Sequence, residues 1–289
     1  MIEIQNIKKT FHSKIVLNDL SLNIYPQERI ALVGQNGCGK TTLIRCLLGL
    51  YQFQGNIHIF GRSIKDKREE ALNKIAFVPQ TPPSLKNTLE EIIDFNSKLC
   101  GHTKDDMRPL LNELGLDLDK FRSTPFKGLS GGMKQKFLIA CALARRPSLL
   151  IMDEPSANLD PKARSVFFRL LSELPKETTM LLTSHRVDEL AGIVSRVIEL
   201  DNGILTMDDI VGGQKNDHLT TKQSCKLLFN RVPESVKQAL RDWDFKPLDN
   251  GELSWSGKIS SADSFRFHAT LTRWSGILEE VSITKSQEG

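Results

Sequence analysis

The sequence predicts an α/β domain built on a largely parallel β-sheet, followed by a small α+β domain. Three observations lead to this fold class. Short apolar runs alternate with helix-like segments, as in a sheet whose strands are connected by helices. The run 29–33 is apolar after Arg29 and the run 149–152 is apolar throughout, as buried parallel strands are. Near residues 211–224 the chain becomes polar and contains adjacent glycines, which indicates a linker between two domains.

The predicted elements follow from hydrophobic periodicity. Residues 2–7 and 20–24 alternate with a period of two, which favours half-exposed antiparallel strands. The expected strands of the large domain are 2–7, 20–24, 29–33, 55–61, 75–78, 149–152, 180–185 and 197–205. A charged, helix-like block at 82–127 and the helix expected at 130–145 form a helical insertion spanning about 82–146. The helix expected at 161–174 follows the strand at 149–152.

The domain boundaries are therefore predicted at 1–212 for the large domain, 213–224 for the linker and 225–289 for the small domain. In the small domain we expect a strand, a helix, a hairpin, a helix and a closing strand near 277–283. Its three tryptophans, Trp243, Trp255 and Trp274, are interpreted as a small core rather than as a ligand cage.

Composition excludes several classes of protein. The chain has 289 residues, of which 39% are hydrophobic and 26% charged, which is typical of a globular protein. A formal charge of +4 does not indicate nucleic-acid binding, and no run reaches the about 18 apolar residues of a membrane span. The N-terminus lacks a signal peptide, so we expect a cytoplasmic protein. The five cysteines have neither a disulfide framework nor metal-ligand spacing.

A glycine-rich loop follows the apolar run 29–33. Residues 34–42 read Gly-Gln-Asn-Gly-Cys-Gly-Lys-Thr-Thr and match the pattern G-x-x-x-x-G-K-[ST]. In that pattern backbone N–H groups surround a β-phosphate, the lysine reaches the β/γ oxygens, and the first threonine hydroxyl ligates Mg²⁺. The alternative is a purely structural turn. The predicted phosphate-binding residues are Gly34, Asn36, Gly37, Cys38, Gly39, Lys40, Thr41 and Thr42.

Two acidic residues directly follow the apolar run 149–152. Asp153 and Glu154 would lie beside the phosphate loop, because open α/β sheets bind ligands at the carboxyl ends of their strands. Asp153 can hold Mg²⁺, and Glu154 can accept a proton from an attacking water. The alternative interpretation of this pair is an exposed turn.

A second candidate anion site begins the helix expected at 130–145. Ser130, Gly131 and Gly132 precede a long apolar helix, so they offer a hydroxyl, free N–H groups and the positive end of the helix dipole. Alone, such a segment is commonly just an N-cap.

With these segments in place, residues 1–210 resemble the ATP-binding-cassette (ABC) ATPase family. Residues 129–135, LSGGMKQ, are similar to its signature, and residues 152–160, MDEPSANLD, to its Walker B segment and D-loop. Gln80 stands where the family has its Q-loop glutamine, and His185 where it has its switch histidine. Phe11 falls where an aromatic residue stacks on adenine. Cys38 departs from the more usual alanine or serine.

The resemblance implies the fold of the ABC nucleotide-binding domain: a phosphate-loop parallel sheet, an antiparallel β subdomain and a helical insertion. It also implies a head-to-tail dimer that holds two ATP molecules, each between the phosphate loop of one subunit and Ser130–Gly132 of the other. Glu154 would polarise the hydrolytic water and His185 would contact the γ-phosphate. Gln80 would contact Mg²⁺ together with Thr41 and Asp153. The remaining implied nucleotide contacts are Gln135 and Asp160, the latter coupling the two sites.

Three functions compete under this resemblance. The first is the ATPase subunit of a membrane transporter, bound to a separate permease on the inner face of the membrane and paired with a second copy or a paralogue. The second is a soluble cassette protein acting on ribosomes or DNA, and the third is a subunit that drives signalling or assembly of a membrane complex. The helical insertion and C-terminal segment resemble exporter-type (ABC-2-like) ATPases, which include the one that supports copper-site assembly in nitrous oxide reductase. We therefore expect an exporter subunit and no nucleic-acid partner.

Overall fold

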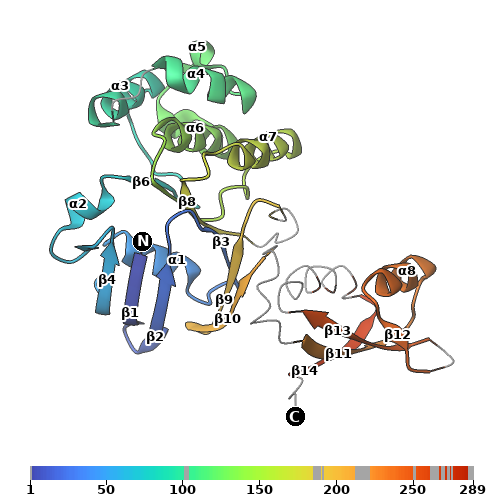
Figure 1. Cartoon of the computed structure of the whole chain (residues 1–289). Helices are drawn as coiled ribbons and strands as arrows, with labels where there is room; N and C mark the ends of the chain where they lie inside the picture. The colour runs from blue at the N-terminus through green and yellow to red at the C-terminus, as the bar shows by residue number, and fades with distance from the viewer. Residues whose placement is uncertain are drawn as a thin grey trace. The chain divides into compact units, whose positions relative to one another are not determined.

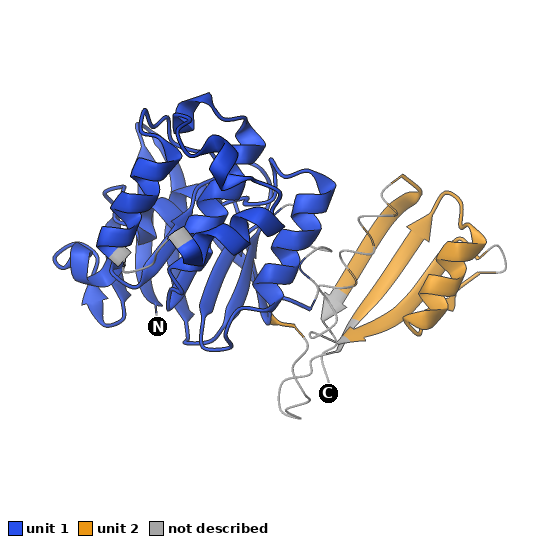
Figure 2. Ribbon diagram, turned by 90° about the horizontal axis from the view of Figure 1, so that it is seen from above, with its two compact units in different colours: residues 1–208 blue, residues 209–289 orange. Residues whose placement is uncertain are grey.

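The chain folds into two compact units, residues 1–208 (unit 1) and 209–289 (unit 2), as the computed structural model shows (Figure 2). The division lies close to the linker predicted at 213–224. The residues that the structure describes are 2–100, 104–184, 190, 192–211, 222–249, 252–260, 267, 271, 274 and 276–285.

A six-stranded sheet with the order β10-β9-β3-β8-β7-β6 forms the centre of unit 1 (Figure 1). Its strands are β3 (Arg29–Val33), β6 (Ile75–Val78), β7 (Leu149–Met152), β8 (Thr179–Thr183), β9 (Arg196–Asp201) and β10 (Ile204–Ile210). The pairs β6–β7, β7–β8, β8–β3 and β3–β9 are parallel. Every residue of β7 and β8 is buried, which explains why β7 is apolar throughout and β8 is apolar between its two terminal threonines.

A second, antiparallel sheet has the order β2-β1-β4-β5. Its strands are β1 (Ile2–Phe11), β2 (Lys14–Ile24), β4 (Gln54–Ile59) and β5 (Arg62–Ser63). Strands β1 and β2 are longer than predicted. Their pairing shifts register at three points after Ile4, and each shift interrupts the alternation on which the prediction relied. The inward side chains, with Ile4 and Leu22 among them, join the main core together with α1 (Lys40–Leu47).

Helices make up the rest of unit 1. They are α2 (Arg68–Leu72), α3 (Leu89–Cys100), α4 (Lys104–Glu113), α5 (Leu118–Phe121), the short 3-10 helix η1 (Phe126–Gly128), α6 (Gly131–Ala144) and α7 (Pro161–Ser172). In Figure 1 the green helices α3, α4 and α5 gather beside α6. Phe126 packs on Phe137 of α6, with ring centroids 5.7 Å apart. No helix among the described residues is long and apolar enough to cross a lipid bilayer.

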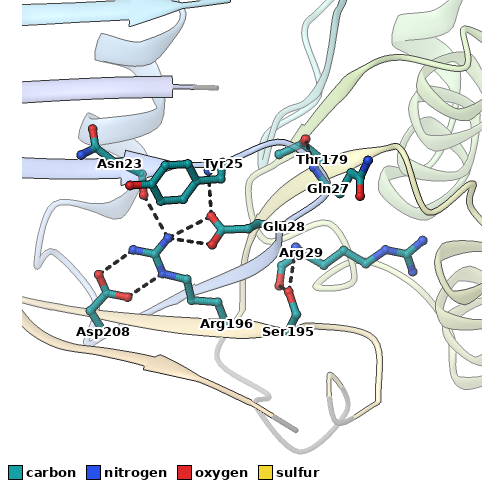
Figure 3. Close-up of polar contacts among 9 residues, drawn as sticks. All are labelled: Asn23, Tyr25, Gln27, Glu28, Arg29, Thr179, Ser195, Arg196 and Asp208. Carbon is teal, nitrogen blue, oxygen red and sulfur yellow. Dashed lines mark hydrogen bonds and ion pairs between the residues drawn. The ribbon is translucent and has the colours of Figure 1, made fainter. Parts of the chain in front are cut away.

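Arg196 connects three parts of unit 1 at the start of β9 (Figure 3). Its guanidinium bonds to Glu28, with Nη1 2.9 Å from Oε2, and to both oxygens of Asp208 on β10, at 2.6 and 2.7 Å. It also donates to the carbonyl of Asn23 on β2. Only 12% of the Arg196 side chain is exposed. Strand β2 of the antiparallel sheet, the β2–β3 connection and strand β10 therefore share one largely buried cation.

Unit 2 is an α+β domain with its own core. Its elements are β11 (Lys222–Phe229), α8 (Glu234–Asp242), β12 (Lys246–Pro247), β13 (Ser254–Ser260) and β14 (Leu278–Lys285). The antiparallel order β12-β13-β11-β14 is that of a split βαβ arrangement. Trp255 and Trp274 are buried in its core, and Trp243 packs against it, which confirms the predicted tryptophan core.

Candidate nucleotide site

The glycine-rich loop connects β3 to α1, as the sequence predicts. Two of its glycines are required by close packing. A Cβ on Gly34 would lie 2.1 Å from the carbonyl oxygen of Leu200, and one on Gly39 would lie 2.9 Å from the Leu17 side chain. Both residues have positive φ, 142° and 119°, a conformation that glycine adopts at little cost. The loop is therefore held against strands β2 and β9 from behind.

The front of the loop opens into a pocket of about 160 Å³. Two of the pocket residues come from other strands: Gln80 follows β6 and Glu154 follows β7. The lining residues are Asn36, Gly37, Gly39, Lys40, Thr41, Thr42, Gln80 and Glu154. They meet at the carboxyl ends of parallel strands, which is where open α/β sheets bind ligands.

Lys40 supplies a positive charge at this pocket. Its side chain is largely buried, and Nζ donates to the carbonyl oxygens of Gly34 at 2.6 Å and Gln35 at 3.1 Å. Lys40 is also the first residue of α1, so the ammonium and the positive end of the helix dipole lie together. Both favour a bound anion such as a phosphate group.

Cys38 and Gly34 belong to the loop but lie behind the pocket. Cys38 is buried, with its Sγ 3.9 Å from Lys40 Nζ. Its carbonyl oxygen accepts a hydrogen bond from the N–H of Gly203, in the β9–β10 turn, at 2.9 Å. A Cβ on Gly203 would lie 2.3 Å from the carbonyl oxygen of Val16. The β9–β10 turn thus supports the phosphate loop on the side that faces away from the pocket.

The two predicted acids are positioned by a threonine from the next strand. Thr183 Oγ1, at the end of β8, donates to Asp153 Oδ1 at 2.8 Å and accepts from the Glu154 N–H at 2.7 Å. Asp153 is 2% exposed and Glu154 8%. Glu154 has φ of 47°, and such a left-handed conformation in a non-glycine residue is often found at functional sites. Glu154 reaches the pocket, while Asp153 lies behind it.

Phe11 ends β1 and is part of a small aromatic cluster. Its ring packs edge-on against Tyr51, with centroids 5.2 Å apart, and Lys9 Nζ lies 4.5 Å from its centroid. The ring is 37% exposed. Part of this aromatic surface is therefore open to solvent, and a purine base can stack on such a surface.

The signature segment occupies a different place. Ser130 caps α6 by accepting from the Met133 N–H at 3.2 Å, and both Ser130 and Gly131 are exposed. Of the described residues that line the pocket of the phosphate loop, none belongs to this segment. Gln135 differs from the expectation: it is fully buried, and its Nε2 donates to the carbonyl of Pro155 at 3.2 Å. Gln135 therefore contacts the chain itself.

Asp160 also has partners within the chain. It caps α7 through the Ala163 N–H at 2.9 Å, and its Oδ2 lies 2.8 Å from Lys136 Nζ on α6. The hydrogen bonds from Lys136 and then from the Ala163 backbone hold the pKa of Asp160 at about 2. The predicted His185 lies outside the described residues; the preceding Ser184 is 4% exposed.

Thr183 and Lys136 are two site residues that the sequence alone did not single out. Thr183 is a polar residue inside an apolar strand that ends beside the pocket, which is a usable signal. Lys136 gives no such signal, because its partner Asp160 is distant in sequence.

Comparison with known proteins decides the family. The family described as ABC transporter matches residues 17–157. The energy-coupling factor transporter ATP-binding protein EcfA2 of Clostridium perfringens is 33% identical over 224 residues, which cover 72% of this chain and 79% of that protein. The chain belongs to the ABC transporter family. It is thus an ATP-binding and ATP-hydrolysing subunit of this class, and unit 1 has the fold of the ABC nucleotide-binding domain.

Two further ABC relatives extend the comparison. The methionine import ATP-binding protein MetN of Campylobacter jejuni is 30% identical over 276 residues, covering 86% of this chain and 77% of that protein. A solved structure described as the ATP binding subunit of an ABC transporter superposes with a TM-score of 0.66 at 29% identity, covering 73% of this chain and 90% of that one.

Proposed function

We propose that this ABC subunit closes on ATP as a head-to-tail dimer and thereby drives a separate permease. The observation that carries the proposal is the separation of two phosphate-binding elements. The phosphate loop and Glu154 line one pocket, while Ser130 and Gly131 are exposed elsewhere at the start of α6. A second copy would bring its own Ser130 and Gly131 to that pocket and complete a composite site, as in the ABC family that the chain resembles.

Within the composite site each residue has a distinct role. Backbone N–H groups of residues 36–42 and the Lys40 ammonium bind the phosphates. Glu154 orients the attacking water and accepts its proton, and His185 contacts the γ-phosphate. Phe11 stacks on the base. Gln80 lies on the segment that leads to the helical insertion. It contacts the metal and the γ-phosphate and so links them to that insertion.

The oxygen donors at the site fit Mg²⁺. Thr41 and Gln80 line the pocket, and the Asp153 carboxylate is held by Thr183 beside Glu154. Mg²⁺ prefers oxygen ligands and is commonly bound through one or two protein groups together with substrate phosphates and waters. Thr41, Asp153 and Gln80 would hold it. When bound, it neutralises charge on the β- and γ-phosphate oxygens.

The permease places the subunit on the inner face of the membrane. For the direction of transport, the sequence favours an exporter-type system. One observation favours import instead: MetN, named for methionine import, aligns over 86% of the chain, more than unit 1 alone contains. Transport assays with the co-purified permease in vesicles of known orientation separate the two directions. Co-purification of ribosomes or DNA, in place of a membrane protein, would contradict both.

The Glu154→Gln variant tests the dimer and the role of Glu154 together. It retains the shape of the side chain but has a far weaker base, so ATP binds and turnover stops. We expect an ATP-dependent dimer in size-exclusion chromatography and ATPase activity lowered by at least about a hundredfold. Lys40→Met is the matched control, because without ATP binding no dimer forms. A Glu154→Gln protein that hydrolyses ATP at the wild-type rate contradicts the proposed role.

A further inference from the structure

Three contacts tie the segment Asp153–Asp160 to the first turns of α6. Gln135 Nε2 donates to the Pro155 carbonyl at 3.2 Å. Lys136 Nζ pairs with Asp160 Oδ2 at 2.8 Å. Between them the backbones approach so closely that a Cβ on Gly132 would lie 2.9 Å from the Asn158 carbonyl oxygen. The segment is thus fastened to α6 along its length.

The burial and charge of these groups make the connection stiff. Gln135 is fully buried, and a buried amide is costly to leave without its partner. The Lys136 side chain is only 12% exposed, whereas that of Asp160 is 53% exposed, so the ammonium is held within the fold and solvent reaches the pair from the Asp160 side. The hydrogen bonds from Lys136 first, and then from the Ala163 N–H, lower the pKa of Asp160 to about 2, which reflects their stabilisation of the carboxylate.

The two fastened elements face different nucleotides in the dimer. Glu154, at one end of the segment, lines the pocket of the subunit's own phosphate loop. Ser130 and Gly131, at the start of α6, are exposed and reach the nucleotide on the partner. Because close-packed contacts transmit small displacements, a shift of Glu154 in one site moves the start of α6 in the other.

We propose that Lys136, together with Gln135, is a positioning residue that makes the Glu154 segment and the start of α6 move as one body. This inference rests on the proposed dimer. It gives Asp160 a role inside its own subunit, as the anchor for Lys136 and the cap of α7.

The test compares variants of the full-length protein by ATPase kinetics. Lys136→Met and Asp160→Asn each remove one charge of the pair, and asparagine still caps α7. We expect each to lower kcat about tenfold, because a displaced catalytic group acts poorly, with KM for ATP within about twofold of wild type. The double variant should be no slower than either single variant, since both remove the same contact.

Two matched controls separate positioning from stability. Lys136→Arg keeps the cation and should restore kcat to within about twofold of wild type. Lys162→Met makes the same chemical change at an exposed lysine in the first turn of α7 and should leave kcat unchanged. A variant that is only less stable would contain a smaller fraction of active protein but would keep the wild-type kcat per active site. Active-site titration with labelled nucleotide measures this fraction.

The inference is overturned if Lys136→Met and Asp160→Asn retain wild-type kcat, or if their effects multiply in the double variant. A Lys136→Arg protein as slow as Lys136→Met also overturns it. Should Lys136→Met fail to fold, Asp160→Asn alone decides. Failure of the proposed dimer would be recognised separately, because Glu154→Gln would then form no dimer with ATP. The kcat values of Lys136→Met and Asp160→Asn could still be compared with that of the wild type.

Discussion

The hydroxyl of Thr183 donates to the Asp153 carboxylate at 2.8 Å and accepts from the Glu154 N–H at 2.7 Å. One side chain at the end of β8 thus orients both acids of the neighbouring strand. Since Thr183 and Asp153 are almost fully buried, the Asp153 carboxylate has no water in easy reach to replace this contact. We therefore expect the ATPase activity to depend on Thr183, although this residue itself lies behind the pocket.

Replacing Thr183 should therefore impair catalysis. Thr183→Val keeps the shape and removes both hydrogen bonds, and loss of such a supporting contact typically costs about 10–100-fold in activity. Thr183→Ser retains the hydroxyl and should stay within about threefold of wild type. Steady-state ATPase assays at saturating Mg²⁺ and ATP measure the difference. Equal activity of the valine and serine variants would contradict this role.

The Arg196 cluster should contribute substantially to the stability of unit 1. Arg196→Met leaves Glu28, whose side chain is 23% exposed, and Asp208 without their cation. We expect a loss of about 1–3 kcal/mol in the free energy of unfolding, as for broken, partly buried ion networks. Urea denaturation measures it. Arg62→Met, which breaks a pair with both side chains about half exposed, should cost less than about 0.5 kcal/mol.

The Asp160 carboxylate should make stability depend on pH in acid. Its pKa is lowered from 3.8 to about 2 in the folded chain, so ionised Asp160 stabilises the native state above the unfolded value. That contribution is lost as the pH falls from about 4 to about 2. The stability difference between wild type and Asp160→Asn should therefore be constant above pH 4 and shrink below it. A difference independent of pH across this window would show that the ion pair has no such effect.

Two cysteines should react slowly in the native protein. Burial raises the pKa of Cys46 and of Cys225 to about 11, although Lys9 partly opposes the shift at Cys46. At pH 7.5 their thiolate forms are rare, and the thiolate is the nucleophile. Mass spectrometry after brief maleimide treatment should find both unmodified, and modified once the protein is unfolded in urea. Rapid native labelling of either would contradict the burial.

The two units should fold independently. Unit 2 has a core of its own, built around Trp255 and Phe267, and it begins after Asp208, where unit 1 ends. A chain ending at residue 211 should therefore bind ATP with an affinity within about twofold of the full chain, as expected for separate domains. Fluorescence titration with a labelled nucleotide measures this. An unfolded truncated chain would contradict the boundary.

The apolar strands and the phosphate loop were predictable because their signals are local. The runs at 29–33, 75–78 and 149–152 coincide with β3, β6 and β7, since a strand buried on both faces needs apolar residues throughout. Strand β5 escaped prediction because it is too short to show a period.

Contacts between residues distant in sequence could not be predicted, because the signals that the sequence carries are local. The pair Lys136–Asp160 joins two helices, and nothing near either residue indicates the other. The motif places Gln135 among the nucleotide contacts, yet packing buries it against Pro155. A motif thus states which residue types stand together, while the tertiary fold decides which of them turn toward the ligand.

The hydrogen bond from Gly203 to the Cys38 carbonyl has a consequence for how this chain can change over evolution. The β9–β10 turn touches the underside of the phosphate loop, and there is no room at Gly203 for a side chain. Hairpin turns usually tolerate insertions, but here an added residue would displace the support of the nucleotide site. We therefore expect insertions in this hairpin to weaken nucleotide binding, and peptide tags or fluorophores belong elsewhere on the surface.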